Sequence, residues 1–88
     1  MARSILFSPT AFEEYLQWRK LDDETIDRIN QLILDILREP FKGIGKPEPL
    51  KGNYKGLWSR RITQTHRLVY PVKGDVIEIV KCYGHYDD

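Results

Sequence analysis

The chain has 88 residues, enough for one domain (residues 1–88) with a single core but too few for a large buried cavity, so we expect any active site at the surface. A hydrophobic fraction of 41% and a charged fraction of 31% exclude the disordered and membrane-embedded classes, and no apolar run approaches the roughly 20 residues that cross a bilayer. The formal net charge of +1 conceals an uneven distribution of charge along the chain.

The first nine residues, MARSILFSP, have too short an apolar run for a secretory signal and no small-residue cleavage site, so we expect a cytoplasmic protein. The apolar run at residues 4–7 predicts a short buried strand. Ser8 and Pro9 then predict a helix start, because serine caps a helix and proline occupies its first position without losing a needed hydrogen bond. Apolar side chains at helical spacing carry this helix to about residue 20: Phe12, Tyr15, Leu16 and Trp18.

A second helix is predicted after Asp22 and Asp23, which are both candidate caps. Its apolar residues recur every three or four positions, which predicts one face packed against a core: Ile26, Ile29, Ile33, Ile36 and Leu37. Pro40 disfavours helical backbone at Glu39, so we expect the helix to end there.

Residues 41–56 contain four glycines together with Pro47 and Pro49, which predicts a loop. This loop begins a basic block, because residues 42–67 have a net charge of +6, against −3 for residues 1–41 and −2 for residues 68–88. Glu48 is the one acid in the block. Lysine and arginine beside aromatic side chains are typical of a polyanion-binding surface, since they displace counterions from phosphates. A solvated charged face is the alternative interpretation.

Three strands are predicted after the loop. Residues 57–64 alternate, with Ser59 and Arg61 on one face and Trp58 and Arg60 on the other. Residues 66–72 and 75–82 form a hairpin around Lys73-Gly74-Asp75, and Pro71 predicts an edge or a bulge. The order β-α-α-β-β-β predicts an α+β fold, with two helices packed on one face of a small, mostly antiparallel sheet. Cys82, the single cysteine, excludes an internal disulfide and a cysteine metal cluster.

Four residues stand out as a set for cleaving RNA: Glu48, Arg67, His85 and Tyr86. RNA carries its own nucleophile, the 2′-hydroxyl. An enzyme therefore needs only to remove that proton, neutralise charge on the phosphorane and protonate the departing 5′-oxygen, without a metal or other cofactor. One acid, one fixed cation and one imidazole supply these functions. DNA would not be cleaved by this route, because it lacks the 2′-hydroxyl.

Each of these residues also has a structural interpretation. Glu48, in GKPEPLKG, is placed to pair with Lys46 or Lys51, and the same lysines would keep it ionised as a base must be. Alternation in HRLVY puts Arg67 on the face opposite to Leu68. There it either forms a solvated cross-strand ion pair or holds a phosphate in its planar fork.

His85 lies near the C-terminus, where frayed residues are common, and His66 fits a structural role. Aromatic side chains near the cations either stack on unpaired bases or complete a small core: Tyr54, Trp58, Tyr83 and Tyr86. GIGKPEPLKG superficially resembles a phosphate-binding glycine loop. No helix start follows it and the Walker lysine-serine pair is missing, so nucleotide binding is excluded.

Three motifs in order, KPEPLK, LWSRRITQTHRLVY and the closing GHY, resemble the YoeB toxins of bacterial toxin–antitoxin systems, within the RelE superfamily. With YLQW and EPFKGIGKPEPL, the resemblance covers nearly the whole chain. It implies a RelE-like fold and a ribosome-dependent endonuclease that cuts mRNA in the ribosomal A site and so inhibits translation. It also implies a YefM-like antitoxin that covers the toxin and with it represses their own operon. Operator DNA is then contacted only through that complex, and a homodimer is left open.

Carried over residue by residue, the resemblance gives Glu48 as general base, Arg67 as phosphate-stabilising cation, His85 as general acid and Tyr86 as the tyrosine that orders the site. The resemblance implies that Lys51 and Arg61 contact the RNA, and Lys46 and the aromatic Trp58 complete the predicted RNA-binding set. The chain departs from the family pattern at Tyr83-Gly84, where some relatives carry a basic and an aromatic residue. It departs again at Asp87-Asp88, which add negative charge near His85 beyond the usual final tyrosine.

Two other functions compete with cleavage. A non-catalytic ribosome-binding or nucleic-acid-binding module would need the basic block, but it would have no reason to combine Glu48, Arg67 and His85. An antitoxin-bound operon regulator would form the complex without cutting RNA.

Overall fold

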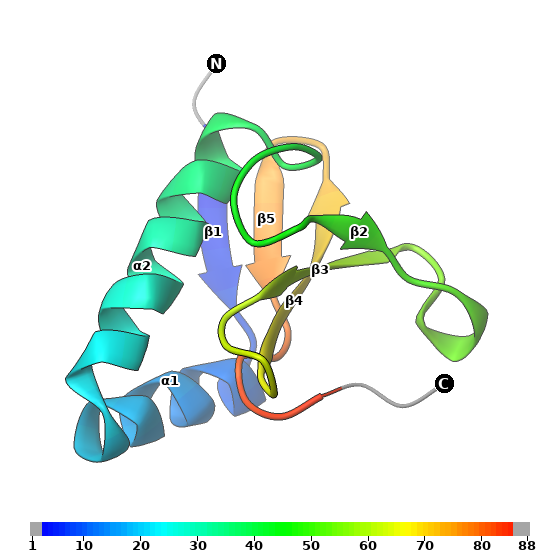
Figure 1. Cartoon of the computed structure of the whole chain (residues 1–88). Coiled ribbons are helices and arrows are strands. Elements are labelled where there is room, and N and C mark those ends of the chain that lie inside the picture. The colour runs from blue at the N-terminus through cyan, green and yellow to red at the C-terminus, as the bar shows by residue number, and fades with distance from the viewer. Residues whose placement is uncertain (1–2, 86–88) are drawn as a thin grey trace.

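The computed structural model of the chain describes residues 3–85. Two helices lie against a five-stranded sheet with strand order β1-β5-β4-β3-β2 (Figure 1). The strands are β1 (Ser4–Phe7), β2 (Glu48–Pro49), β3 (Leu57–Arg61), β4 (Arg67–Lys73) and β5 (Val76–Ile79). The β1–β5 pair is parallel and the other neighbours are antiparallel. The predicted α+β fold, with both helices packed on a mostly antiparallel sheet, is confirmed.

Helix α1 (Pro9–Leu21) begins at the predicted residue, where Ser8 Oγ accepts a hydrogen bond from the Ala11 N–H at 3.1 Å. It buries Ala11 and Trp18, whereas Phe12 is 51% exposed and Leu16 is 45% exposed. The predicted apolar face is therefore displaced. The side that meets the core runs through positions 11, 15 and 18, and positions 12 and 16 lie beside it.

Helix α2 (Asp23–Arg38) is capped by the predicted Asp22, whose Oδ1 accepts from the Glu24 N–H at 3.1 Å. Its apolar face packs on the sheet as predicted, with Ile29 and Ile36 fully buried. The helix ends before Pro40, also as predicted. Within residues 3–85, neither helix is long and apolar enough to cross a membrane.

The segment predicted as a loop, residues 41–56, contains a strand that the sequence pattern missed. Glu48 and Pro49 of β2 pair with Ser59 and Trp58 of β3, and a short 3₁₀ helix, η1 (Gly52–Tyr54), follows. A strand of two residues with a proline in it carries no alternation, so periodicity cannot find it.

Pro71 lies in β4, the central strand, so the edge-strand alternative is wrong and the bulge alternative is correct. Val72 pairs with Ile77, and Val69 pairs with Lys81. Two residues of β4, 70 and 71, therefore face three residues of the other segment, 78 to 80, which is a bulge. The irregularity falls beside the proline, which has no N–H to give to the ladder. It also turns Lys81 toward the same face as Val69.

The glycines of the GIG motif serve packing. Gly43 and Gly45 have φ angles of +130° and +80°, and a Cβ on Gly45 would lie 2.7 Å from Leu32 Cδ2. Only glycine allows this loop to approach α2 so closely. The superficial likeness to a phosphate loop has this structural cause.

Candidate active site

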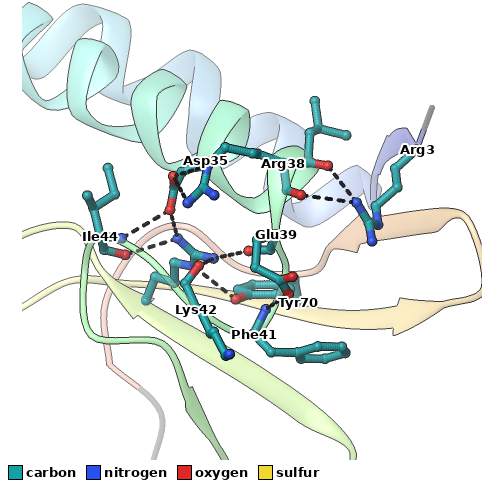
Figure 2. A network of polar contacts seen from close by, with 10 residues as sticks. Arg3, Asp35, Arg38, Glu39, Phe41, Lys42, Ile44 and Tyr70 are labelled. Carbon is teal, nitrogen blue, oxygen red and sulfur yellow. Dashed lines mark hydrogen bonds and ion pairs between the residues drawn. The ribbon is translucent and has the colours of Figure 1, made fainter. Parts of the chain in front are cut away.

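The loop that leads into β2 is held by a buried cation. Arg60 is 0% exposed and points to the helix side of the sheet, where Figure 2 shows its partners gathered around one guanidinium. Its Nε donates to Tyr70 Oη at 3.0 Å and its Nη1 to a carboxylate oxygen of Asp35. It also donates to three loop carbonyls: Glu39 at 2.7 Å, Lys42 at 3.0 Å and Ile44 at 3.0 Å. Arg60 therefore fixes residues 39–44 and is not part of the basic surface predicted for residues 42–67.

Asp35 completes this anchor as an ion. Its burial favours the neutral acid, but hydrogen bonds from Arg60, Arg38 and the Ile44 N–H outweigh burial and lower its pKa to about 2. The Arg38 Nη2 atom lies 2.9 Å from Oδ1, and the Ile44 nitrogen lies 3.0 Å from Oδ2. The carboxylate is charged at neutral pH and ties α2 to the loop.

The opposite side of the sheet, which we call the open face, carries Glu48. Residues in register on neighbouring strands point to the same side of a sheet. Glu48 pairs with Ser59, Ser59 pairs with Val69, and Val69 pairs with Lys81. These four residues therefore form one row across the open face, with the Glu48 carboxylate at one end and the Lys81 ammonium group at the other.

The next row on the open face holds Arg61 and Arg67, which pair across β3 and β4. Arg67 lies two strands from Glu48 and two residues further along, which corresponds to about 10 Å across and about 7 Å along the sheet. Both side chains are long enough to reach a phosphate bound between them. The register thus brings together three of the predicted site residues, namely Glu48, Arg61 and Arg67.

Arg67 is held in one orientation by its own hairpin. Its Nη1 donates to the carbonyls of Thr63 at 2.9 Å, Gln64 at 3.2 Å and His66 at 3.2 Å. The side chain is only 8% exposed, and its partner across β3 is another cation. The interpretation of Arg67 as a solvated cross-strand ion pair is therefore wrong.

His85 follows a segment that is tied to the body of the protein. The Arg67 N–H donates to the Gly84 carbonyl at 2.9 Å, and the Gly84 N–H donates to His66 Nδ1 at 2.8 Å. Figure 1 shows this C-terminal segment running back beside the turn between β3 and β4. His85 is thereby carried to the end of β4 where Arg67 lies, and it is exposed there. Tyr86, Asp87 and Asp88 lie outside the described residues.

Two of the aromatic residues near the cations, Trp58 and Tyr83, pack against the core on the helix side of the sheet. Trp58 pairs with Tyr70 on the helix side and lies 4.9 Å from Phe41, centroid to centroid, so the structure does not bring it to the face of Glu48. Tyr83 packs in a cluster with Trp18 and His66, at centroid distances of 5.0 Å and 4.7 Å. For Tyr83, completion of the core is the correct interpretation.

The lysines near the open face include one that the sequence pattern missed. Lys46 and Lys51, both exposed, flank β2 as predicted from their places beside Glu48. Lys81 lies in the segment 68–88, whose net charge is negative, so the charge pattern did not single it out. The bulge between residues 77 and 81 brings it to the open face. A Cβ on Gly84 would lie 3.6 Å from Lys81 Nζ, so this ammonium group is close to the residue before His85.

Cys82 does not belong to the site. It is 0% exposed, and burial followed by the nearby Glu14 carboxylate raises its pKa to about 12, so the thiol stays neutral and unreactive. Within residues 3–85, no group of three His, Cys, Asp or Glu side chains is arranged to hold a metal ion.

The open face therefore combines a carboxylate, two guanidinium groups and an ammonium group, with an imidazole at its margin. Residues 7–86 match the protein family described as "YoeB-like toxin of bacterial type II toxin-antitoxin system". The chain belongs to this family. Toxin YoeB of Streptomyces coelicolor is 52% identical over 82 residues, which make up 93% of this chain and 98% of that protein.

Solved YoeB structures have the same fold. A YoeB dimer from Staphylococcus aureus superposes with a TM-score of 0.88 at 46% identity, over 96% of this chain and 98% of that one. A heterotetrameric YoeB–YefM toxin–antitoxin complex from the same organism gives a TM-score of 0.87 at 46% identity, with the same coverage. The family resemblance carried by the KPEPLK, LWSRRITQTHRLVY and GHY motifs is confirmed.

Proposed function

We propose that this toxin is an endoribonuclease that cuts mRNA in the ribosomal A site and so inhibits translation. The observation that carries the proposal is the register of the sheet, which puts Glu48 and Arg67 on one face, beside the segment that ends in His85. An acid, a cation and an imidazole on one open face suit acid–base cleavage of a phosphodiester. Glu48 and Arg61 are exposed on this face, so a macromolecular substrate can reach them.

In the proposed reaction, Glu48 removes the proton from the 2′-hydroxyl. The 2′-oxygen then forms a bond to phosphorus, the bond from phosphorus to the 5′-oxygen breaks, and His85 protonates the departing 5′-oxygen. The products are a 2′,3′-cyclic phosphate and a 5′-hydroxyl. Each proton transfer contributes on the order of 10²–10⁴-fold to the rate.

Arg67 is proposed to stabilise the charge that develops on the phosphorane. Its Nη1 is already hydrogen-bonded to three backbone carbonyls, so little conformational entropy is lost when the guanidinium meets a phosphate. Arg61 and Lys81 add positive charge on either side of it. Lys46 and Lys51, which flank Glu48, are proposed to bind the RNA backbone. The ordering role of Tyr86 stays a prediction.

We further infer that a YefM-like antitoxin binds and neutralises this chain, and that operator DNA is contacted only by the two proteins together. The S. aureus relative forms a heterotetramer with YefM, and it also forms a dimer. Co-expression with the antitoxin followed by size-exclusion chromatography with light scattering tests both assemblies.

The proposal is tested by mapping message ends on ribosomes incubated with the wild-type toxin and its His85→Ala variant. We expect cuts at the A-site codon that leave 5′-hydroxyl ends, and we expect His85→Ala to reduce them by about 10²-fold or more. Lys20→Ala, an exposed change on α1, serves as the control and should cut like the wild type. Intact message on stalled ribosomes, the same for wild type and variant, would instead establish a non-catalytic inhibitor. If the protein binds the antitoxin but neither cuts the message nor stalls ribosomes, the operon-regulator function would be favoured instead.

A further inference from the structure

We propose that His66 is a positioning residue for His85 and acts by holding Gly84. The imidazole Nδ1 of His66 accepts the Gly84 N–H at 2.8 Å, and the next residue, Arg67, donates its own N–H to the Gly84 carbonyl at 2.9 Å. Both polar backbone groups of Gly84 are therefore bound by two consecutive residues, His66 just before β4 and Arg67 at its start. The side chain that follows is His85, so its catalytic consequence rests on the function proposed above.

The ring of His66 is itself fixed by packing. It meets Trp18 edge to face at a centroid distance of 4.7 Å and an interplanar angle of 89°, and it lies 4.7 Å from Tyr83. Trp18 Nε1 donates to the Cys82 carbonyl at 2.7 Å. A rotation of the imidazole that released Gly84 would have to disturb these aromatic contacts. The acceptor atom is therefore held in place before any substrate arrives.

The conformation of Gly84 fits this arrangement. Its φ angle is +79°, in the left-handed region that costs other residues roughly 1–2 kcal/mol. A Cβ at this position would meet Lys81 Nζ only at ordinary contact distance, so backbone conformation and not crowding favours glycine. The Tyr83-Gly84 departure from the family pattern thus has a structural role here. Tyr83 packs on the ring of His66, and Gly84 turns its N–H toward Nδ1.

An accepting Nδ1 carries no proton, so the neutral ring of His66 has its hydrogen on Nε2. A substitution that removes this acceptor but keeps an aromatic ring would therefore release the Gly84 N–H without removing the packing around position 66.

Two variants of His66 separate the hydrogen bond from the packing. In His66→Asn, Oδ1 stands where Nδ1 stood, so the acceptor is kept but the aromatic ring is lost. In His66→Phe, the ring and its aromatic contacts are kept but the acceptor is lost. The readouts are the kcat and KM of cleavage on ribosomes at about pH 7 and hydrogen exchange of the Gly84 amide. Lys20→Ala serves again as the remote control.

We expect His66→Phe to lower kcat by about 10²-fold with little change in KM, the cost of a misplaced catalytic group, and to speed exchange at Gly84. His66→Asn, which keeps the acceptor, should retain most of the wild-type kcat. Unchanged cleavage by His66→Phe would overturn the proposal, and so would equal losses in both variants, since the packing would then be what matters. If the wild-type toxin cuts no message, the proposed function fails. Gly84 exchange that depends on the acceptor at position 66 would still support the clamp, and exchange that does not would overturn it.

Discussion

Arg61 and Arg67 lie directly opposite each other on β3 and β4, so two guanidinium groups share one row of the open face. Like charges at facing positions of a sheet destabilise the fold. Carbonyls of the hairpin turn bind Arg67, and a phosphate bound between the two arginines would relieve what repulsion remains. We infer that this pairing is retained for binding an anion and not for stability.

Replacing Arg61 by glutamine should therefore separate stability from activity. We expect Arg61→Gln to raise the free energy of unfolding by about 0.5 kcal/mol, because the facing like charge is removed. We expect it also to lower message cleavage about tenfold, since a charged hydrogen bond to the phosphate is lost. Urea unfolding and end mapping measure the two effects, with Arg19→Gln on α1 as the control. A less stable Arg61→Gln protein with full activity would contradict this interpretation of the pair.

Arg60 is the neighbour of Arg61 but lies on the opposite face, and we expect its replacement to lower stability. Arg60→Met leaves the Asp35 carboxylate and three loop carbonyls without their buried donor, so we expect a loss of about 3 kcal/mol or more in the free energy of unfolding. Arg19→Met, at an exposed position, should change it by less than about 0.5 kcal/mol. Urea denaturation of both variants measures the difference. Equal midpoints would mean that Arg60 does not anchor the loop.

The anchor should also impose a pH dependence on stability. The pKa of Asp35 is about 2 in the folded protein, below its ordinary value of 3.8, so its ionisation stabilises the fold above pH 3.8. This contribution is lost as pH falls from 3.8 through about 2. We expect the stability gap between wild type and Asp35→Asn to be constant from pH 5 to pH 7 and to shrink below 3.8, as measured by urea unfolding at each pH. A gap that stayed constant down to pH 2 would rule out this role of the carboxylate.

Most of the fold could be predicted from local signals. Ser8, Pro9 and Asp22 cap their helices as the sequence indicates, and the alternation in residues 57–61 and 66–72 places Arg61 and Arg67 on the face opposite to Arg60. These features depend on neighbouring residues only. Patterns of period two and of three to four residues therefore capture them.

The parts that could not be predicted depend on contacts distant in the sequence. Arg60 reads as a surface cation until Asp35 and the loop carbonyls close around it. Pro71 indicates an edge or a bulge, and only the register of the facing segment decides between them. For the site, residue types and the family motifs pointed to Glu48, Arg67 and His85. Lys81 and the clamp on Gly84 emerged only from strand register and packing.

The role of the 2′-hydroxyl can be tested with one substrate change that leaves the protein untouched. Ribosomes are programmed with a message that carries a single 2′-deoxynucleotide immediately 5′ of the phosphate that the wild-type toxin cuts, and the ends are mapped beside those of the all-ribose message. Without the nucleophile, attack through the 2′-oxygen predicts that cleavage at this phosphate disappears, while toxin binding to the ribosome stays the same. Cleavage of the deoxy-substituted bond at the normal rate would contradict acid–base catalysis by Glu48 and His85 and would require a different nucleophile.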